Sequence, residues 1–203
     1  MNDPDFSGQP EGSTPIDDAS GLKQPQISTL DDLNAAEALN IVDAIEWIEG
    51  GRIRSVFQLS FYLELHRRML NDVWDWAGKY RLTNLNIGDV PYYEVPMRLQ
   101  QAGLDFEVQY ETNVVPFLEF VAGYHHRLVW IHPFRNGNGR WARLVCDAVA
   151  MRLRKEPPII WASNDLVIAS EERTRYIAAL QAADRQDIRP LTEYLADHNP
   201  DRV

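Results

Sequence analysis

Apolar positions recur at helical spacing along most of the chain. The first run follows Asp31 or Asp32, either of which can cap a helix, and reaches Gly50 and Gly51. A second run starts at Ser55 and is predicted to end near Gly78, a residue suited to a left-handed helix terminus. Further helices are predicted at residues 97–111, 116–130, 139–154, 170–184 and 190–198. The pattern predicts a mainly helical protein.

One stretch departs from this pattern. Residues 81–96 combine alternating apolar and polar positions with a Gly88-Asp89 turn signal, which is typical of a short β-hairpin. We therefore expect the all-α class with one short β-hairpin, which could act as a flap. No internal repeat of the length found in solenoids is visible.

Residues 1–26 have a different composition from the rest. They hold four prolines, three glycines and almost no large apolar side chains, so burial could not offset the entropy of ordering them. Five acidic residues and no Lys or Arg fall within residues 1–21. The sequence predicts a disordered acidic tail over 1–26, followed by one domain over 27–200.

The chain carries 20 basic and 30 acidic residues, a formal net charge of -10. Such a chain is repelled by phosphate backbones, so direct nucleic-acid binding is not expected. The single Cys146 lies in an apolar run and is predicted to be buried. No signal sequence and no uninterrupted apolar span are visible. We therefore expect a cytoplasmic location without membrane contact.

The segment of residues 131–143 carries the candidate chemistry. Gly137 and Gly139 allow a turn that feeds a helix start, so that backbone N–H groups point outward. Arg140 and Arg143 are three residues apart and project together beside this turn. A helix N-terminus with two guanidinium groups suits a di- or triphosphate better than a single carboxylate. The predicted ligand is a nucleotide.

A histidine precedes the turn. His132 has an ordinary pKa of about 6.5, so it can be neutral near pH 7 and accept the proton of a hydroxyl nucleophile. Pro133 and Phe134 are interpreted as supports, the first restricting the backbone and the second anchoring the loop in the core.

Other polar residues have simpler interpretations. Neighbouring helix residues point about 100° apart, so His125 and His126 are not arranged to bind one metal ion. We interpret both, and His66, as structural histidines that hydrogen-bond within the fold. Arg135 suits contact with a nucleotide or target as well as it suits exposure to solvent.

The run His-Pro-Phe-x-x-Gly-Asn-Gly-Arg-x-x-Arg at residues 132–143 resembles the signature of the Fic/Doc family. Residues 65–81, 86–88, 175–177 and 187–195 resemble neighbouring parts of that family. With the pattern of residues 33–47, the chain resembles the Fic subgroup called mobile mystery protein B. The resemblance implies a helical domain that transfers AMP from ATP to a Ser, Thr or Tyr hydroxyl of a target protein.

The resemblance also implies roles for individual residues. His132 would deprotonate the target hydroxyl, while Arg140 and Arg143 would neutralise charge during transfer. The phosphates would be bound by the remaining nucleotide-site residues, which are Arg135, Gly137, Asn138 and Gly139. A flap would hold the target by strand addition through Ile87, Gly88, Asp89, Val90, Tyr92 and Tyr93.

Two departures from the family pattern concern regulation and metal binding. Most active members have Asp or Glu where this chain has Asn136, which keeps a carbonyl oxygen but no charge, so Mg²⁺ or Mn²⁺ should bind weakly. Many members carry an inhibitory helix with a Ser/Thr-x-x-x-Glu-Gly/Asn motif. The nearest match is Glu37, preceded by Leu33 and followed by Ala38. We hypothesise that Glu37 pairs with Arg143 and blocks the γ-phosphate site.

Other functions fit the same residues. One alternative is transfer of another phosphate-containing group, including kinase-like phosphorylation. This alternative ranks lower, because Doc-type kinases usually have Lys where this chain has Gly139 and Arg140. A second alternative is a nucleotide-binding regulator with little catalysis, since Asn136 lacks the charge of the usual acid. Such a regulator could pair with a DNA-binding partner encoded nearby. A toxin with an external inhibitory partner also suits the family.

Overall fold

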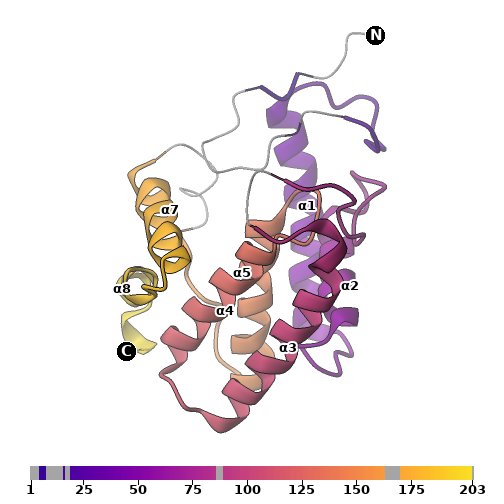
Figure 1. The fold of residues 1–203 in the computed structure, drawn as a ribbon. Helices are drawn as coiled ribbons and strands as arrows, with labels where there is room; N and C mark the ends of the chain where they lie inside the picture. The colour runs from indigo at the N-terminus through magenta and orange to yellow at the C-terminus, as the bar shows by residue number, and fades with distance from the viewer. Residues whose placement is uncertain (1–4, 8–15, 17–18, 86–88, 163–169, 203) are drawn as a thin grey trace.

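The computed structural model describes residues 5–7, 16, 19–85, 89–162 and 170–202. These residues form a mainly helical protein, as the sequence predicts (Figure 1). In chain order the elements are α1 (Leu30–Gly50), α2 (Leu59–Leu70), the 3-10 turn η1 (Tyr92–Glu94), α3 (Val95–Thr112), α4 (Phe117–Ile131), α5 (Asn138–Ala148), the π-helical turn η2 (Val149–Arg154), α7 (Glu171–Asp184), α8 (Arg189–His198) and the 3-10 turn η3 (Pro200–Arg202).

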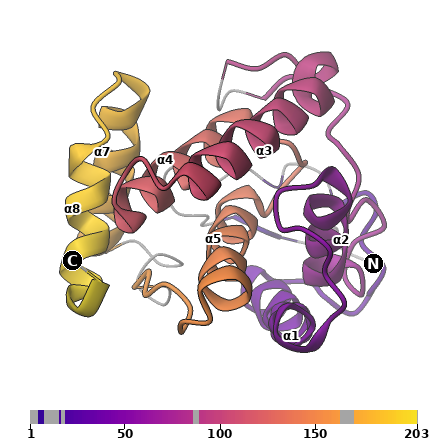
Figure 2. The same ribbon diagram turned by 90° about the horizontal axis from the view of Figure 1, so that it is seen from below.

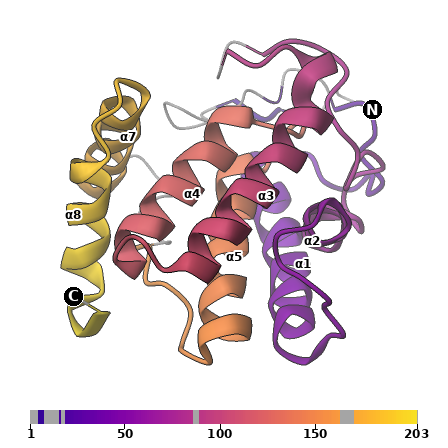
Figure 3. The same ribbon diagram turned by 60° about the horizontal axis from the view of Figure 1, so that its bottom comes forward.

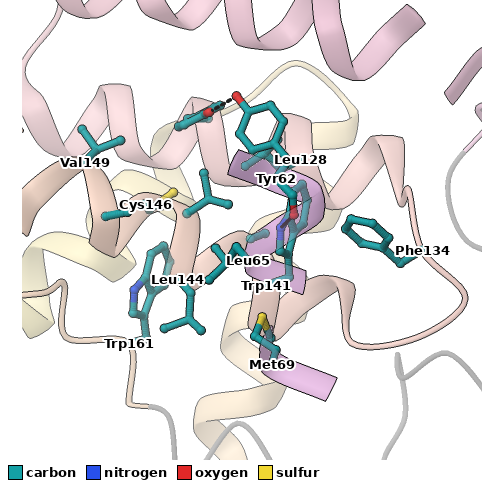
Figure 4. Packing of buried hydrophobic residues seen from close by; sticks show 14 of the residues in the cluster. Tyr62, Leu65, Met69, Leu128, Phe134, Trp141, Leu144, Cys146, Val149 and Trp161 are labelled. Carbon is teal, nitrogen blue, oxygen red and sulfur yellow. Dashed lines mark hydrogen bonds between the residues drawn. The ribbon is translucent and has the colours of Figure 1, made fainter. Parts of the chain in front are cut away.

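The two helices that flank the motif, α4 and α5, pack together in the middle of the molecule (Figures 2 and 3). α1 and α2 lie on one side, α7 and α8 on the other, and α3 packs against α4. Side chains of α2 and α5 meet in the core, where the Trp141 indole donates a 3.0 Å hydrogen bond to the Tyr62 carbonyl (Figure 4). The helix that begins in the motif is therefore anchored on two sides.

α2 is shorter than predicted. The chain turns between Asn71 and Gly78 because the Asp72 N–H donates to the Asn40 side chain of α1 at 2.9 Å, and Trp74 is buried. Gly78 does adopt a left-handed conformation, with φ +76°, but it belongs to this turn. α1 is capped by the Thr29 side chain, which accepts from the Asp32 N–H, rather than by Asp31 or Asp32.

The predicted β-hairpin is not formed by the described residues of 81–96. Pro91 precedes η1 and accepts the Glu94 N–H, while Pro96 lies in the first turn of α3, so the second arm is helical. Tyr80, just before the first arm, makes an isolated bridge with Phe134. Ile87 and Gly88 lie outside the described residues.

Described residues of the predicted tail lie against the helical body. The Lys23 N–H donates to the Val73 carbonyl at 2.8 Å, the Asp75 N–H donates to the Gly21 carbonyl at 2.9 Å, and Phe6 is buried in the core. The sequence predicts disorder for residues 1–26, whereas these described residues contact the helices. One buried ring and a few backbone hydrogen bonds hold them there. The domain boundary at residue 27 stays a prediction.

Cys146 is fully buried, as predicted. Burial raises the pKa of its thiol well above the usual range. Over the ranges that the structure covers, no helix is both long and apolar enough to cross a bilayer.

Candidate active site

His132 ends α4 with a left-handed backbone, φ 51° and ψ 61°. This conformation costs a residue with a Cβ atom about 1 kcal/mol or more, and it turns the chain sharply toward the motif loop. The His132 carbonyl accepts a 2.7 Å hydrogen bond from Arg81 Nε. The side chain itself is buried, with Nδ1 3.1 Å from the Val129 carbonyl.

The surroundings of His132 set its protonation. A carbonyl only accepts, so Nδ1 carries the proton and Nε2 carries the lone pair. Burial lowers the pKa of His132 to about 4, and the positive charge of Arg81 adds to this, while the Val129 carbonyl opposes it. The imidazole is therefore neutral at pH 7 and can accept a proton at Nε2, as the sequence predicts for a general base.

Phe134 packs the motif loop into the core. It is fully buried, stacks on His66 with ring centroids 3.6 Å apart, and meets Trp141 edge to face at 5.0 Å. The buried Asn138 amide closes the loop by pairing with both backbone groups of Phe134, each at 2.9 Å. The Asn138 side chain thus holds the loop, which leaves only its backbone for a phosphate.

His66 connects α2 to the same loop. The Gly78 N–H donates to Nδ1 at 2.9 Å, so Nε2 carries the hydrogen and donates to the Asn136 carbonyl at 3.0 Å. Burial lowers the pKa of His66 to about 3, which keeps the ring neutral. The structural interpretation of His66 is confirmed. The sequence held no signal for its partners, because both are backbone groups brought in by the fold.

Both arginines of the motif lie beside the start of α5. Gly137, with φ +75°, directly precedes the helix. A Cβ atom added to Gly137 would lie 4.0 Å from Arg140 Nη2, and one added to Gly139 would lie 3.9 Å from Arg143 Nη1. Two cationic groups therefore flank a turn that opens a helix N-terminus, an arrangement suited to anions.

Glu37 contacts Arg140 and not Arg143, so the hypothesised pair with Arg143 is wrong. Glu37 Oε2 lies 2.6 Å from Arg140 Nη1, and Oε1 accepts a 2.6 Å hydrogen bond from Trp74 Nε1. The carboxylate is only 2% exposed. Arg140 faces α1, whereas Arg143 faces α7, where it opposes the rise in the pKa of Tyr176 that burial causes.

The remaining candidates lie at the edge of this group. Arg135 donates to the Ser20 hydroxyl at 3.2 Å and lies 6.0 Å from the Trp76 ring. The side-chain Oδ1 of Asn136 accepts from the Gly137 N–H at 2.6 Å. Among the flap candidates, Val90 is buried, whereas Asp89, Tyr92 and Tyr93 are exposed.

Comparisons with known proteins agree with this geometry. Residues 56–150 match the model of the Fic/DOC family. Protein adenylyltransferase Fic of Nematostella vectensis is 32% identical over 165 residues, which are 79% of this chain and 37% of that protein. Protein adenylyltransferase fic-1 of Caenorhabditis elegans is 33% identical over 140 residues, 68% of this chain and 26% of that protein. The chain spans about a third of the length of these curated relatives.

Solved structures share the fold. A structure of Fic-1 from C. elegans has a TM-score of 0.65 and 29% identity, covering 80% of this chain and 47% of that one. An N-terminal Fic domain from Bartonella quintana, solved with bound ADP, has a TM-score of 0.64 and 18% identity, covering 91% and 93% of the two chains. Together these matches show that residues 56–150 of this chain form a Fic/DOC family domain.

Proposed function

We propose that this domain transfers AMP from ATP to a Ser, Thr or Tyr hydroxyl of a target protein. The observation that carries the proposal is the position of the neutral His132, at the start of the loop of residues 133–137 that leads into a helix N-terminus flanked by Arg140 and Arg143. The names of the curated relatives, protein adenylyltransferases that match up to 79% of this chain, support the same reaction.

The site residues suit each part of such a transfer. The target hydroxyl oxygen would form a bond to the α-phosphorus as the bond to the β-phosphate oxygen breaks and pyrophosphate leaves. His132 Nε2 would take the hydroxyl proton, which its low pKa allows throughout the neutral range. Backbone N–H groups at the start of α5 and the two guanidinium groups would bind the phosphates and neutralise the developing charge.

The residues fit a weakly held divalent cation. Asn136 offers one neutral side-chain oxygen, Oδ1, which also accepts from the Gly137 N–H, and over the described ranges no group of three His, Cys, Asp or Glu side chains could bind a metal ion. Mg²⁺ in such sites is held largely by phosphates and water, so one protein ligand is compatible with it. When bound, Mg²⁺ or Mn²⁺ would neutralise phosphate charge.

The target is proposed to bind beside Asp89, Val90, Tyr92 and Tyr93. The exposed rings of Tyr92 and Tyr93 offer apolar contact, and Tyr93 is 68% exposed. The strand addition expected from the sequence involves residues outside the described ones and stays a prediction, and the exposed rings add contact through side chains. Assignment to the mobile mystery protein B subgroup, a toxin role and a cytoplasmic location stay predictions.

Mass spectrometry of the purified protein, incubated with lysate and ATP labelled separately at the α- and γ-phosphorus, tests the proposed reaction. We expect adducts of AMP mass that carry the α label. Adducts of phosphate mass that carry the γ label would instead support kinase-like transfer. ATP binding without any adduct would favour the nucleotide-binding regulator, with or without a DNA-binding partner.

We further propose that Glu37 restrains Arg140. Glu37→Gln keeps an acceptor for Trp74 Nε1 but removes the charge that holds Arg140. A hydrogen bond between charged groups contributes about 1.5–3 kcal/mol. Because Arg140 would no longer have to leave Glu37 in order to contact phosphate, ATP affinity should rise about tenfold, and the transfer rate should rise with it. Isothermal titration with ATP measures this directly.

Glu46→Gln is the matched control, because Glu46 is an exposed carboxylate on the same helix. ATP affinity should not change in that variant. Equal ATP affinity in the wild type and in Glu37→Gln would show that the pair with Arg140 imposes no restraint.

A further inference from the structure

Arg81 is a buried cation held entirely by backbone groups. It is 4% exposed, and its guanidinium donates to the carbonyls of His132, Thr83 and Val90. Over the described ranges it contacts no carboxylate. A buried charge is tolerated when it is fully hydrogen-bonded, and only the planar fork of arginine can reach several carbonyls at once.

These three carbonyls belong to two separate parts of the candidate site. The His132 carbonyl, 2.7 Å from Arg81 Nε, is part of the left-handed residue that carries the base. Val90 is one of the residues beside which the target is proposed to bind, and Thr83 lies in the stretch that follows Arg81. One side chain therefore fixes the base relative to the target-binding segment.

Backbone contacts reinforce this connection. The Arg81 N–H donates to the Pro133 carbonyl at 3.0 Å, and Tyr80 forms an isolated bridge with Phe134. Both the main chain and the side chain at position 81 thus hold the first residues of the motif. Among the described residues, the Arg81 guanidinium hydrogen-bonds only to carbonyls that lie outside α5, so it does not reach the nucleotide side of the site at the start of that helix.

We propose that Arg81 is a positioning residue that aligns the His132 base with the bound target hydroxyl, without contributing to ATP binding. This inference rests on the proposed transfer reaction. It follows that loss of Arg81 slows transfer at saturating ATP, because the hydroxyl and His132 Nε2 no longer meet in the required geometry. Affinity for ATP stays the same, since Arg140, Arg143 and the helix start are unaffected.

Arg81→Gln is the test, and Arg152→Gln is its matched control. Arg152 also donates to two backbone carbonyls, those of Glu49 and Gly51, but it does so at the far end of α1. For Arg81→Gln we expect the rate of adduct formation in lysate at saturating ATP to fall at least tenfold, while the Kd for ATP changes less than twofold. Arg152→Gln should change neither quantity.

Hydrogen exchange followed by mass spectrometry provides a readout that needs no activity. Exchange should rise in residues 89–94 and 132–136 together in Arg81→Gln, with α2, α4 and α5 unchanged. If wild-type protein gives no adduct, the proposed reaction fails while the exchange data still decide whether Arg81 connects the two segments.

Several results would overturn the proposal. One is a normal transfer rate in Arg81→Gln; another is a general rise in exchange with loss of ATP binding, which indicates a purely structural residue. If Arg81→Gln does not fold, Arg81→Lys replaces it, with the same expected split between transfer rate and ATP affinity. Failure of both variants to fold would also reject a positioning role.

Discussion

Replacing His132 with alanine should reduce transfer by about 10²–10⁴-fold, the usual contribution of a general base. The structure places the proton of this imidazole on Nδ1, toward the Val129 carbonyl, and so leaves Nε2 as the basic atom. No other described histidine replaces it, since both ring nitrogens of His66 hydrogen-bond to backbone groups and His125 pairs with the Tyr176 hydroxyl. The rate of adduct formation at saturating ATP measures the loss.

His126→Ala provides the control for this experiment. His126 lies on the same helix, one turn and a half before His132, and its ring hydrogen-bonds Asp184 instead of the motif. Its removal should leave transfer within about twofold of the wild type. Residual transfer by His132→Ala at more than a tenth of the wild-type rate would mean that another group accepts the proton.

The second large effect concerns acid stability. Burial lowers the pKa of His66 to about 3 and that of His132 to about 4, below the usual value of 6.5. At pH values below 6.5 and above the folded-state pKa of each histidine, the unfolded chain binds more protons than the folded chain. The free energy of unfolding therefore decreases as pH falls below 6.5. From pH 6.5 to 4.5 the two histidines should together lower the free energy of unfolding by about 4 kcal/mol. His125, with a pKa well below 6.5, acts in the same direction.

Asp147 acts in the opposite direction. Burial raises its pKa to about 7, although hydrogen bonds from Trp161 and Ile159 oppose the rise. The folded state therefore holds a proton that the unfolded state has lost, and this stabilisation is present at low pH and disappears as pH rises through 7. Over the same interval Asp147 should offset about 2 kcal/mol of the loss from the histidines.

Urea denaturation at several pH values between 4.5 and 6.5 measures the balance. His66→Gln keeps a donor and an acceptor but does not titrate, so it should reduce the acid loss by about 2 kcal/mol. An identical slope in His66→Gln and the wild type would show that His66 does not titrate as its burial requires.

Much of the helical fold follows from the sequence, because a repeating apolar face is a local signal. The predicted helix at 116–130 corresponds to α4 at Phe117–Ile131, and that at 170–184 to α7 at Glu171–Asp184. The described residues of 81–96 form no hairpin, because Pro91 and Pro96 favour helical turns despite the alternating pattern. The end of α2 was missed since it depends on a contact with Asn40, 32 residues earlier.

The candidate site shows the same division. The candidate residues His132, Arg140 and Arg143 could be chosen from residue types and spacing, and the structure places both guanidinium groups beside the glycines of one turn. Which arginine Glu37 meets could not be inferred, because side chains three residues apart share a helix face yet reach different neighbours. Arg81 gave no signal of its own, since its partners are carbonyls that exist at every position.

The pairing of residues 21–23 with the turn after α2 affects how the protein should be shortened. This pairing lies over Trp74, whose indole donates to Glu37, which in turn holds Arg140. A version trimmed to begin at residue 27 would lose the backbone bonds of Gly21 and Lys23 to this turn. Such a truncation would alter the support of Arg140, which is proposed to bind phosphate, so kinetic constants measured on a trimmed domain and on the full chain describe two different proteins.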